Sequence, residues 1–409
     1  MQLVEKHRIS KSSEFYELLD NGAYKSKNLY NSALYAIRQY YFENKKYLPY
    51  VQVYKLFFEQ HQQDYYALPA KVAQQTLKMV DYNFKSFFKA LASYKKDPSK
   101  FEAKPRIPKY LDKQRGRCIL KYTSQAISKK SLDKTGCIKL SGLDVEIPTR
   151  VSYKDLCEVR VIKKVNSYVV EVVYETDQEE VGHVDNGRYA SIDLGVSNLA
   201  TVTSNVKGFQ PFAIDGKPLK SYNRYYNKEL GHYKSILEKR HKGRKSSNRT
   251  KWLTEKRNNK VNDCLHKASR IIVNQLVSND IHMLVVGYND GWKQDTNLGR
   301  RNNQSFVQIP HHKFVSLLEY KCKLVGIKLI TVHESYTSKC SFLDNEKICK
   351  HESYCGRRVH RGLFRSANGT LINADMNGSY NILRRCIPNA FADGVEGVLV
   401  HPVVIKTAN

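Results

Sequence analysis

Apolar residues recur every three or four positions in two stretches near the start of the chain, and this spacing predicts two amphipathic helices. Lysines occupy the other faces of the second stretch, so its outer side is basic. Prolines at positions 98, 105 and 108 then exclude a helix interior and predict an extended, basic linker. The recurring apolar positions are Tyr30, Leu34, Ile37 and Tyr41, and then Ala73, Leu77, Val80, Phe84, Phe87 and Leu91.

From about residue 117 to 175 the apolar period changes to two, which predicts a small antiparallel β unit. Beyond it, apolar strands alternate with helical stretches, the pattern of a mixed α/β sheet. The longest helical stretch, 219–282, is interrupted by a basic turn at 243–248, so two antiparallel helices are expected there. The other expected elements are strands at 189–193, 199–203, 283–287 and 328–333, and helices at 310–325 and 375–385.

The charge balance points to a polyanionic partner. Lys and Arg number 68 against 39 Asp and Glu, a formal net charge of +29 that would destabilise a compact chain by self-repulsion. The basic residues are interleaved with 28 Tyr and 15 Phe, as in proteins that grip phosphates while bases stack on rings. A solvated basic surface is the alternative.

The sequence also indicates where in the cell the protein is found. It has no stretch of about 18 apolar residues, and its start, MQLVEKHRIS, lacks an apolar signal core. Nine cysteines, an odd number, suit reduced thiols rather than a disulfide framework. We therefore expect a soluble, intracellular protein without a membrane partner.

Three carboxylates stand at the ends of predicted elements. Asp193 ends an apolar strand, Glu334 follows another, and Asp375 begins a helix. Carboxylates that converge from separate elements can hold two cations in a phosphodiesterase, and Mg²⁺ suits such oxygen ligands. For Asp375 alone, a helix cap is the alternative role.

These acids lie within long, ordered blocks of sequence. The blocks include LPAKVAQQTLKMVDYNFKSFFKAL, SIDLGVSNLATV, KASRIIVNQLVSNDIHMLVVGYNDGWKQ and RGLFRSANGTLINADMNGSYNILRR. In these blocks, and over nearly its whole length, the chain resembles the TnpB family of transposon-encoded RNA-guided nucleases, relatives of the Fanzor proteins and of type V CRISPR effectors.

That resemblance implies a multidomain α/β protein with a RuvC-like, ribonuclease-H-type catalytic domain. The implied parts are a β-barrel wedge domain at 1–10 and 116–184, an α-helical recognition lobe with its basic linker at 11–115, the RuvC-like nuclease domain at 185–335 and 373–409, and a zinc-finger-like insertion that binds target nucleic acid at 336–372.

One position departs from the family pattern. The family's first and last catalytic aspartates correspond to Asp193 and Asp375, whereas its glutamate corresponds to Gly287, which ends MLVVG. Neighbouring strands lie about 4.8 Å apart, so Glu334 could supply the missing carboxylate from the next strand. We expect that relocation, with Asp193, Glu334 and Asp375 as ligands of two Mg²⁺ ions. The alternative is an inactive site in a protein that only binds.

The insertion carries Cys340, Cys349 and Cys355, with His351 between them. Structural zinc sites commonly use two close pairs such as CxxC, and none is present here. We expect a basic flap that has lost its zinc, and an irregular zinc site is the alternative. Candidate nucleic-acid contacts across the chain are Lys71, Lys78, Lys85, Arg106, Lys109, Arg240, Lys242, Arg244, Lys245, Arg249, Lys251, Arg357 and Arg361.

The sequence thus predicts a transposon-encoded, Mg²⁺-dependent RNA-guided DNA endonuclease. Its partners would be a guide RNA (omega RNA) and a target double-stranded DNA beside a short adjacent motif, with sequence specificity supplied by base pairing. It would act in the bacterial cytoplasm or nucleoid, or in a eukaryotic nucleus. Two alternatives remain: a nuclease-inactive RNA-guided binder, and a guide-free nuclease or transposon accessory factor. The oligomeric state is left open.

Overall fold

The computed structural model describes residues 1–176, 185–241, 243–244, 246–289, 291, 299, 304, 306–392, 394 and 399–407. The chain divides into two units, residues 1–177 and 178–409. The first holds most of the helices predicted near the start together with the small β unit. The second holds the mixed α/β sheet.

Two long helices dominate the first unit, as the apolar periodicity predicts. They are α1 (Phe15–Asn44) and α4 (Ala70–Lys96), whose apolar stripes pack into one core. Two short helices that the periodicity missed, α2 (Tyr50–Glu59) and α3 (Gln63–Tyr66), and the 3₁₀ turn η1 (Pro98–Lys100) complete this part. The segment after η1 up to β2 has no helix or strand, in agreement with the predicted linker.

The β part of the first unit is antiparallel. Its four-stranded sheet has the order β1-β6-β5-β2, formed by β1 (Gln2–Ser10), β6 (Ser167–Glu175), β5 (Leu156–Lys163) and β2 (Leu120–Thr123). The strand β1 pairs with β6 along its whole length, which joins the first ten residues to this sheet. The remaining elements are η2 (Ser124–Ala126), α5 (Lys129–Thr135) and the two-stranded sheet of β3 (Cys137–Lys139) and β4 (Glu146–Pro148).

A half-buried carboxylate ties the helices of this unit to its sheet. Asp20 on α1 accepts hydrogen bonds from Lys163 (2.7 Å) and Tyr168 (2.8 Å) and forms an ion pair with Arg117. Despite the opposing effect of burial, these three donors lower the pKa of Asp20 to about 2. The carboxylate therefore stays charged and holds α1 against the sheet.

The second unit is built on a six-stranded mixed sheet of order β11-β10-β7-β8-β9-β15. Its strands β7, β8 and β9 are antiparallel neighbours, β10 pairs with β7 in parallel, and β11 pairs with β10 in parallel. The predicted mixed α/β fold is confirmed. The strands are β7 (Tyr189–Leu194), β8 (Asn198–Ser204), β9 (Phe212–Asp215), β10 (Met283–Gly287), β11 (Lys328–Val332) and β15 (Val403–Ile405).

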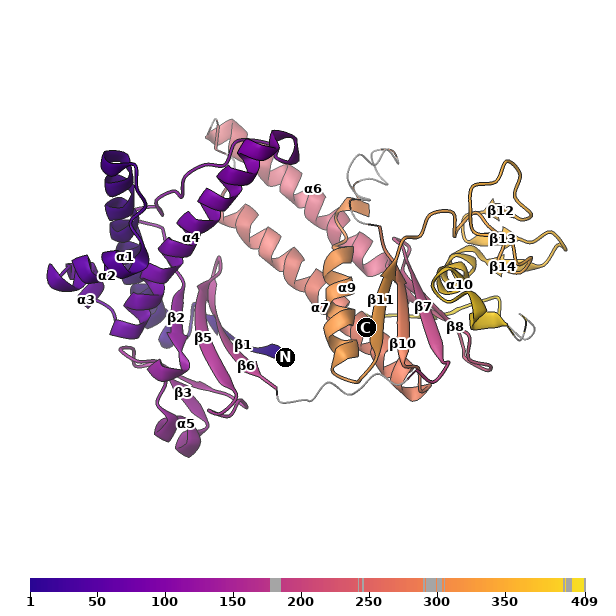
Figure 1. Ribbon diagram of the computed structural model, residues 1–409, viewed down its shortest axis with the longest axis horizontal. Helices are drawn as coiled ribbons and strands as arrows, with labels where there is room; N and C mark the ends of the chain where they lie inside the picture. The colour runs from indigo at the N-terminus through magenta and orange to yellow at the C-terminus, as the bar shows by residue number, and fades with distance from the viewer. Residues whose placement is uncertain are drawn as a thin grey trace. The chain divides into compact units, whose positions relative to one another are not determined.

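Alternate side chains of the central strands point to opposite faces of this sheet. Ile192 and Val286 pack into the core formed with helices α7 and α9, whereas Val285 packs with Ile382 of α10. In Figure 1, α10 lies on one side of β7 and β10 and α9 on the other. The helices are α6 (Lys217–Arg240), α7 (Asn248–Ser278), α9 (His311–Lys323) and α10 (Ala374–Cys386).

The helices α6 and α7 form the expected antiparallel pair. The turn between them ends in Ser247. The Ser247 hydroxyl accepts a hydrogen bond from the backbone N–H of Thr250 (3.2 Å), and the Thr250 hydroxyl accepts one from the backbone N–H of Ser247 (2.9 Å). This reciprocal cap satisfies orphan donors at the start of α7.

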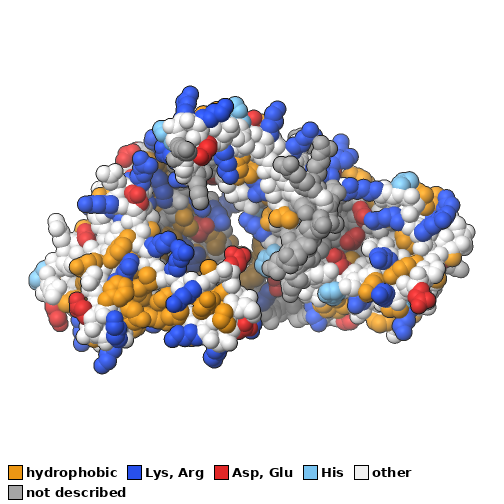
Figure 2. All heavy atoms as spheres, turned by 90° about the horizontal axis from the view of Figure 1, so that it is seen from above, with side chains coloured by type: hydrophobic (Ala, Val, Ile, Leu, Met, Phe, Trp, Pro, Cys, Tyr) orange, Lys and Arg blue, Asp and Glu red, His pale blue; other side chains and the backbone are white. Residues whose placement is uncertain are grey.

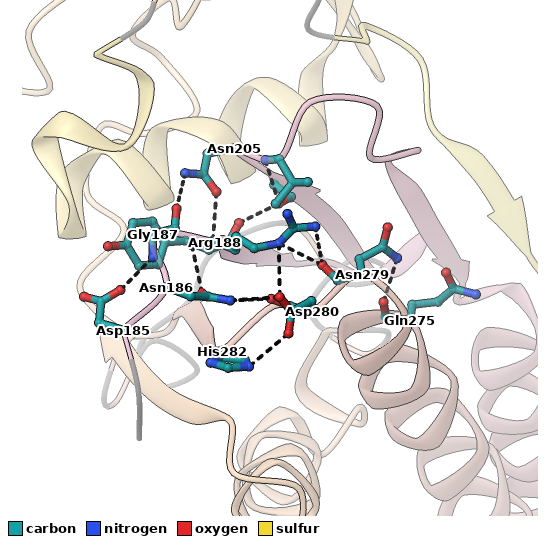
Figure 3. A network of polar contacts seen from close by, with 12 residues as sticks. Asp185, Asn186, Gly187, Arg188, Asn205, Gln275, Asn279, Asp280 and His282 are labelled. Atoms are coloured by element: carbon teal, nitrogen blue, oxygen red, sulfur yellow. Dashed lines mark hydrogen bonds and ion pairs between the residues drawn. The ribbon is translucent and has the colours of Figure 1, made fainter. Parts of the chain in front are cut away.

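A polar network fixes the beginning of β7 (Figure 3). Arg188 donates to the backbone oxygen of Asn279 at the end of α7 (2.7 and 3.1 Å). Asn186 donates to the backbone and side-chain oxygens of Asp280, and His282 forms an ion pair with the same carboxylate when protonated. The starts of β7 and β10 are thus held in register, so their opposite ends are presented at one edge of the sheet.

The segment between β11 and α10 forms a separate small layer, called the flap here (residues 336–372). It holds the antiparallel strands β12 (Arg357–His360) and β13 (Leu363–Arg365) and most of β14 (Leu371–Asn373), which leads into α10. The 3₁₀ turn η3 (Pro388–Phe391) follows α10. Phe342 of the flap stacks on Tyr380 of α10, with ring centroids 4.6 Å apart.

Candidate active site

Asp193 lies near the end of β7 on the sheet face covered by α10. A Cβ on Gly378 of that helix would lie 3.0 Å from Oδ2 of Asp193, so a glycine there lets the helix pass close to the carboxylate. Two residues earlier on the same face, Ser191 Oγ donates to the backbone oxygen of Ser379 (2.7 Å), and Ser379 Oγ donates back to that of Ser191 (3.0 Å). These bonds set the position of α10 over Asp193.

Asp375 stands in the first turn of α10, and its carboxylate does not cap the helix. Asn373 performs the capping, since its Oδ1 accepts the backbone N–H groups of Asp375 (3.0 Å) and Met376 (3.2 Å). The carboxylate of Asp375 instead accepts a hydrogen bond from Asn198 Nδ2 (2.8 Å) and lies 3.7 Å from the guanidinium of Arg358. The helix cap considered as its alternative role is therefore filled by another residue.

Glu334 lies two residues beyond β11, in a rigid setting. Its N–H donates to Asn289 Oδ1 (2.9 Å), and its backbone oxygen accepts from the Thr337 hydroxyl (2.8 Å). Its Oε2 is buried and has no hydrogen-bond partner in the part of the chain that the structure describes. A buried carboxylate oxygen without a partner is costly unless a ligand satisfies it.

The carboxylate of Glu334 lies beside Gly287. In the β10–β11 register Gly287 pairs with Val332, and a Cβ built on Gly287 would be 2.9 Å from Glu334 Oε2 and 2.5 Å from Ile382 Cδ1. The space into which a side chain at 287 would extend is thus taken by Glu334 and Ile382.

The three acids influence one another electrostatically. Burial raises the pKa of Asp193 well above its usual value, and the charges of Asp375 and Glu334 raise it further, against the opposing effect of Arg358. Burial raises the pKa of Glu334 to about 7. Asp193 and its two acidic neighbours therefore repel one another when ionised, an arrangement that a bound cation would relieve.

The donor set is oxygen only, which fits a hard divalent cation such as Mg²⁺. Within the described ranges, no three Asp, Glu, His or Cys side chains lie close enough to form a complete metal site. The partnerless Oε2 of Glu334 and the raised pKa of Asp193 are the two features that favour a cation at this edge.

The cysteines of the flap surround a carboxylate. Glu346 is buried and accepts the backbone N–H groups of Ser341 (2.6 Å) and Cys355 (3.0 Å). Cys340 is buried and contacts the backbone oxygen of Cys349 (3.6 Å), and the Cys349 thiol lies 3.3 Å from His351 Nε2. Glu346 thus bridges the two ends of this loop, the task that a zinc ion performs in a zinc finger.

Asparagines of α10 hold the base of the flap. Asn377 donates to the Cys340 oxygen (2.9 Å) and accepts from the Phe342 N–H (2.9 Å), and Asn381 donates to the oxygens of Thr337 (2.9 Å) and Cys340 (2.8 Å). Both asparagines are fully buried. Because Thr337 also binds the backbone of Glu334, this helix that carries Asp375 indirectly positions Glu334 as well.

Some of the predicted nucleic-acid contacts have partners within the protein, and others are exposed. Lys85 forms an ion pair with Asp81 (2.7 Å), and Arg249 stacks on Trp252 and donates to Tyr233. Arg361 donates to Ser197 Oγ (3.2 Å). Lys242 and Lys245 lie outside the described residues. The remaining candidates are exposed, except for the half-buried Lys78, and they are Lys71, Arg106, Lys109, Arg240, Arg244, Lys251 and Arg357.

Basic side chains are not confined to one patch. Figure 2 shows Lys and Arg spread over the visible surface and interspersed with hydrophobic side chains. This distribution agrees with the net charge of +29.

The sequence did not single out several residues that shape the site. Asn198 holds Asp375, Arg358 faces it, and Asn289 holds the backbone of Glu334. The one available signal for Asn198 was its place five residues after Asp193, in the turn between two predicted strands. No local pattern marks the other two.

Two family models match adjacent parts of the chain. The model described as "OrfB_IS605: Probable transposase" matches residues 168–293, and the one described as "Cas12f1-like, TNB domain" matches residues 311–382. The first runs from the second residue of β6 to six residues beyond β10, and the second covers α9, the flap and most of α10.

A curated relative is the CRISPR-associated endodeoxyribonuclease Cas12f2 of a Micrarchaeota archaeon. It is 28% identical over 238 residues, which make up 54% of this chain and 41% of the relative. The match thus spans less than half the length of that protein.

Solved structures of low identity also align. A Cas12f1-sgRNA-target DNA complex aligns over 93% of this chain and 98% of that one, at 15% identity and a TM-score of 0.37. The mini-RNA-guided endonuclease CRISPR-Cas_phi3 aligns over 98% and 93%, at 12% identity and a TM-score of 0.45. Among the described residues, no helix is long and apolar enough to cross a membrane.

Proposed function

We propose that the chain, a member of the TnpB-like family that unites the OrfB_IS605 and Cas12f1-like proteins, is an RNA-guided DNA endonuclease with a RuvC-type site. The observation that carries this proposal is the group of three acids at one edge of the second unit's sheet, where Asp375 and Glu334 both raise the pKa of Asp193. Carboxylates that raise one another's pKa in this way are typical of functional sites, where a bound cation offsets their repulsion.

The topology supports a ribonuclease-H-type catalytic domain. Numbered along the chain, the first five strands of the sheet lie in the order 3-2-1-4-5, with the first three antiparallel and the last two parallel to the first. Asp193 lies on the first strand, Glu334 follows the fifth, and Asp375 begins the helix that covers them.

We further propose that Glu334 replaces the glutamate that relatives carry at the position of Gly287. Its Oε2 lies 2.9 Å from the point where a side chain at 287 would begin, so the carboxylate reaches the same edge of the sheet from the neighbouring strand. Its backbone is held on both sides, which limits the entropy lost on binding a ligand.

In this mechanism Asp193, Glu334 and Asp375 would hold divalent cations, and the chemistry that such ions would supply is activation of a water and stabilisation of the leaving oxygen in phosphodiester hydrolysis. Asn198 orients the carboxylate of Asp375 through its 2.8 Å hydrogen bond. Arg358, 3.7 Å from the same carboxylate and exposed, is placed to meet the phosphate of the strand being cut.

The proposed partners are a guide RNA and a target double-stranded DNA. The curated relative is named as an endodeoxyribonuclease, and the excess of basic residues provides the charge that both nucleic acids need. We assign the wedge and recognition roles to the first unit, and contact with target nucleic acid to the flap. The flap needs no zinc in this proposal, because Glu346 closes its loop.

Two experiments test the proposal. RNA that co-purifies with the protein is sequenced, and one defined, abundant transcript is expected. The protein with this RNA is then given matching DNA and Mg²⁺: wild type should cut, whereas Asp193→Ala and Glu334→Ala should bind without cutting. A wild type that binds but never cuts would favour the inactive binder, and Glu334→Ala at full rate would exclude the relocated glutamate.

A further inference from the structure

A polar cavity of about 680 Å³ opens along the first half of α6, outside the group of acids. Among the described residues, its lining combines three cations with an array of side-chain amides and contains no carboxylate. The residues used below are Lys220, Asn223, Arg224, Asn227, Lys228 and Gln308.

The amides of this cavity are held in fixed orientations. Asn227 and Gln308 exchange two hydrogen bonds (3.0 and 2.8 Å). Asn223, only 3% exposed, accepts from Arg257 Nε (2.7 Å), while its Nδ2 has no partner among the described residues. Rigid amides offer donors and acceptors in one plane, as the edge of a nucleobase requires.

Two cations of the cavity are free to bind an anion. Arg224 and Lys228 are exposed, and within the described part of the chain neither makes a hydrogen bond or an ion pair. They lie one turn apart on α6, a spacing that places both on the same side of the helix. Cations beside fixed amides match a nucleotide, with its phosphate and its base.

The cavity connects to the acids through a single loop. Lys220 donates to Ser197 Oγ (3.2 Å), and the next residue, Asn198, donates to Asp375 (2.8 Å). Arg361 of the flap donates to the same hydroxyl of Ser197. A strand lying across the acids would therefore reach this cavity within a few nucleotides.

A second cavity, of about 310 Å³, adjoins the first at Ser221 and is lined by three tyrosines of α6. Lys260 lies over the ring of Tyr222 (4.8 Å), and Arg257 over that of Tyr226 (5.8 Å). Tyrosine faces flanked by cations stack unpaired bases. A duplex hides its base faces, so the two cavities together favour a single strand.

We propose that the amide cavity binds one unpaired nucleotide of the DNA strand that is being cut, with Arg224 and Lys228 on its phosphates and the amides of Asn227 and Gln308 on its base. The inference rests on the proposed nuclease function and adds to it a positioning site with a preference among bases. The adjoining tyrosine cavity stacks a neighbouring base.

The first test measures binding of fluorescein-labelled, single-stranded DNA homopolymers of about 12 nucleotides to the full-length Asp193→Ala protein, without guide RNA. Arg224→Ala/Lys228→Ala should weaken binding about tenfold and reduce the salt slope by about 1.4, the value for two phosphate contacts. Lys234→Ala/Lys239→Ala removes the same charge from exposed positions of α6 that line neither cavity, and should change binding less than about threefold. Equal losses in both double variants would overturn the proposal.

The second test concerns the base. Asn227→Leu/Gln308→Leu keeps the volume and charge of the cavity but removes its hydrogen bonds. The protein should distinguish dA, dC and dT homopolymers, and this variant should bind them with more similar affinities. Its melting temperature checks that it is folded. If the double variant unfolds, the single variant Asn227→Leu is used for the same comparison. Equal affinities for all three homopolymers before substitution would also overturn the proposal.

Guided cleavage separates this inference from the function on which it rests. Suppose that wild type never cuts guided DNA, but that Arg224→Ala/Lys228→Ala weakens single-strand binding and the control variant does not. The nuclease proposal then fails and the nucleotide site stands. If wild type cuts and Arg224→Ala/Lys228→Ala cuts equally fast at limiting DNA, the nucleotide site is wrong and the nuclease proposal stands.

Discussion

Replacing Glu334 by Gln tests the electrostatics of the proposed site without a guide or a target. In the metal-free protein, burial raises the pKa of Glu334 from its usual value near 4.5 to about 7. Between these two pH values the folded state keeps a proton that the unfolded chain releases. Stability from this group is therefore present below about pH 4.5 and is lost as the pH rises through 7.

The size of the effect follows from the same pKa values. Each pKa unit corresponds to about 1.4 kcal/mol, so the full penalty above pH 7 has a ceiling of about 3 kcal/mol. Partial solvent contact reduces it, and we expect about 1–2 kcal/mol. Glutamine carries no charge, so Glu334→Gln should be more stable than wild type by that amount near pH 8, and the difference should shrink to about a quarter of it near pH 5.

Thermal unfolding with a chelator present, near pH 5 and near pH 8, measures this difference. Glu319→Gln is the matched control, because it removes the same charge from an exposed position on α9 and should shift stability little at either pH. Added Mg²⁺ should raise the melting temperature of wild type more than that of Glu334→Gln. If Glu334→Gln is no more stable than the control near pH 8, the description of Glu334 as a buried, uncompensated carboxylate is wrong.

Three further predictions concern the neighbours of Glu334. Gly287→Glu alone should disrupt the wild-type protein, because its Cβ would meet Ile382 Cδ1 at 2.5 Å. When Gly287→Glu and Ile382→Val are added to the Glu334→Ala variant, they should restore part of the lost cleavage. No recovery would argue against the idea that a glutamate at 287 and Glu334 place their carboxylates at the same position. Asn198→Ala should slow cleavage about 10–100-fold while DNA binding is kept, and an unchanged rate would exclude its positioning role. Glu346→Gln should lower the free energy of unfolding by about 1–2 kcal/mol, whereas a zinc-selective chelator in Mg²⁺-free buffer should leave the melting of wild type unchanged; a large effect of that chelator, with zinc found by elemental analysis, would restore the zinc site in the flap.

The sequence alone determined most of the elements. Helices α1, α4, α9 and α10 and the strands β7, β8, β10 and β11 follow from apolar periods of 3.6 and 2, which depend on neighbours along the chain, whereas β9 and β15 were not predicted. The ends of these elements also located Asp193, Glu334 and Asp375 as candidates, because acids at the ends of two strands and at the start of a helix stand out against apolar runs. Short helices such as α2, rich in aromatic residues, carried too little periodicity to be predicted.

Only the tertiary structure decided where those acids lie relative to one another. The register of β10 and β11 brings Glu334 beside Gly287, and the Asn373 side chain takes the capping role that Asp375 could have had. The fold also places Glu346 among the flap cysteines and the amides of Asn227 and Gln308 against each other, 81 residues apart in the chain. Local patterns record which residues an element contains, whereas contacts between distant segments depend on strand order and helix packing, which no short stretch of sequence encodes.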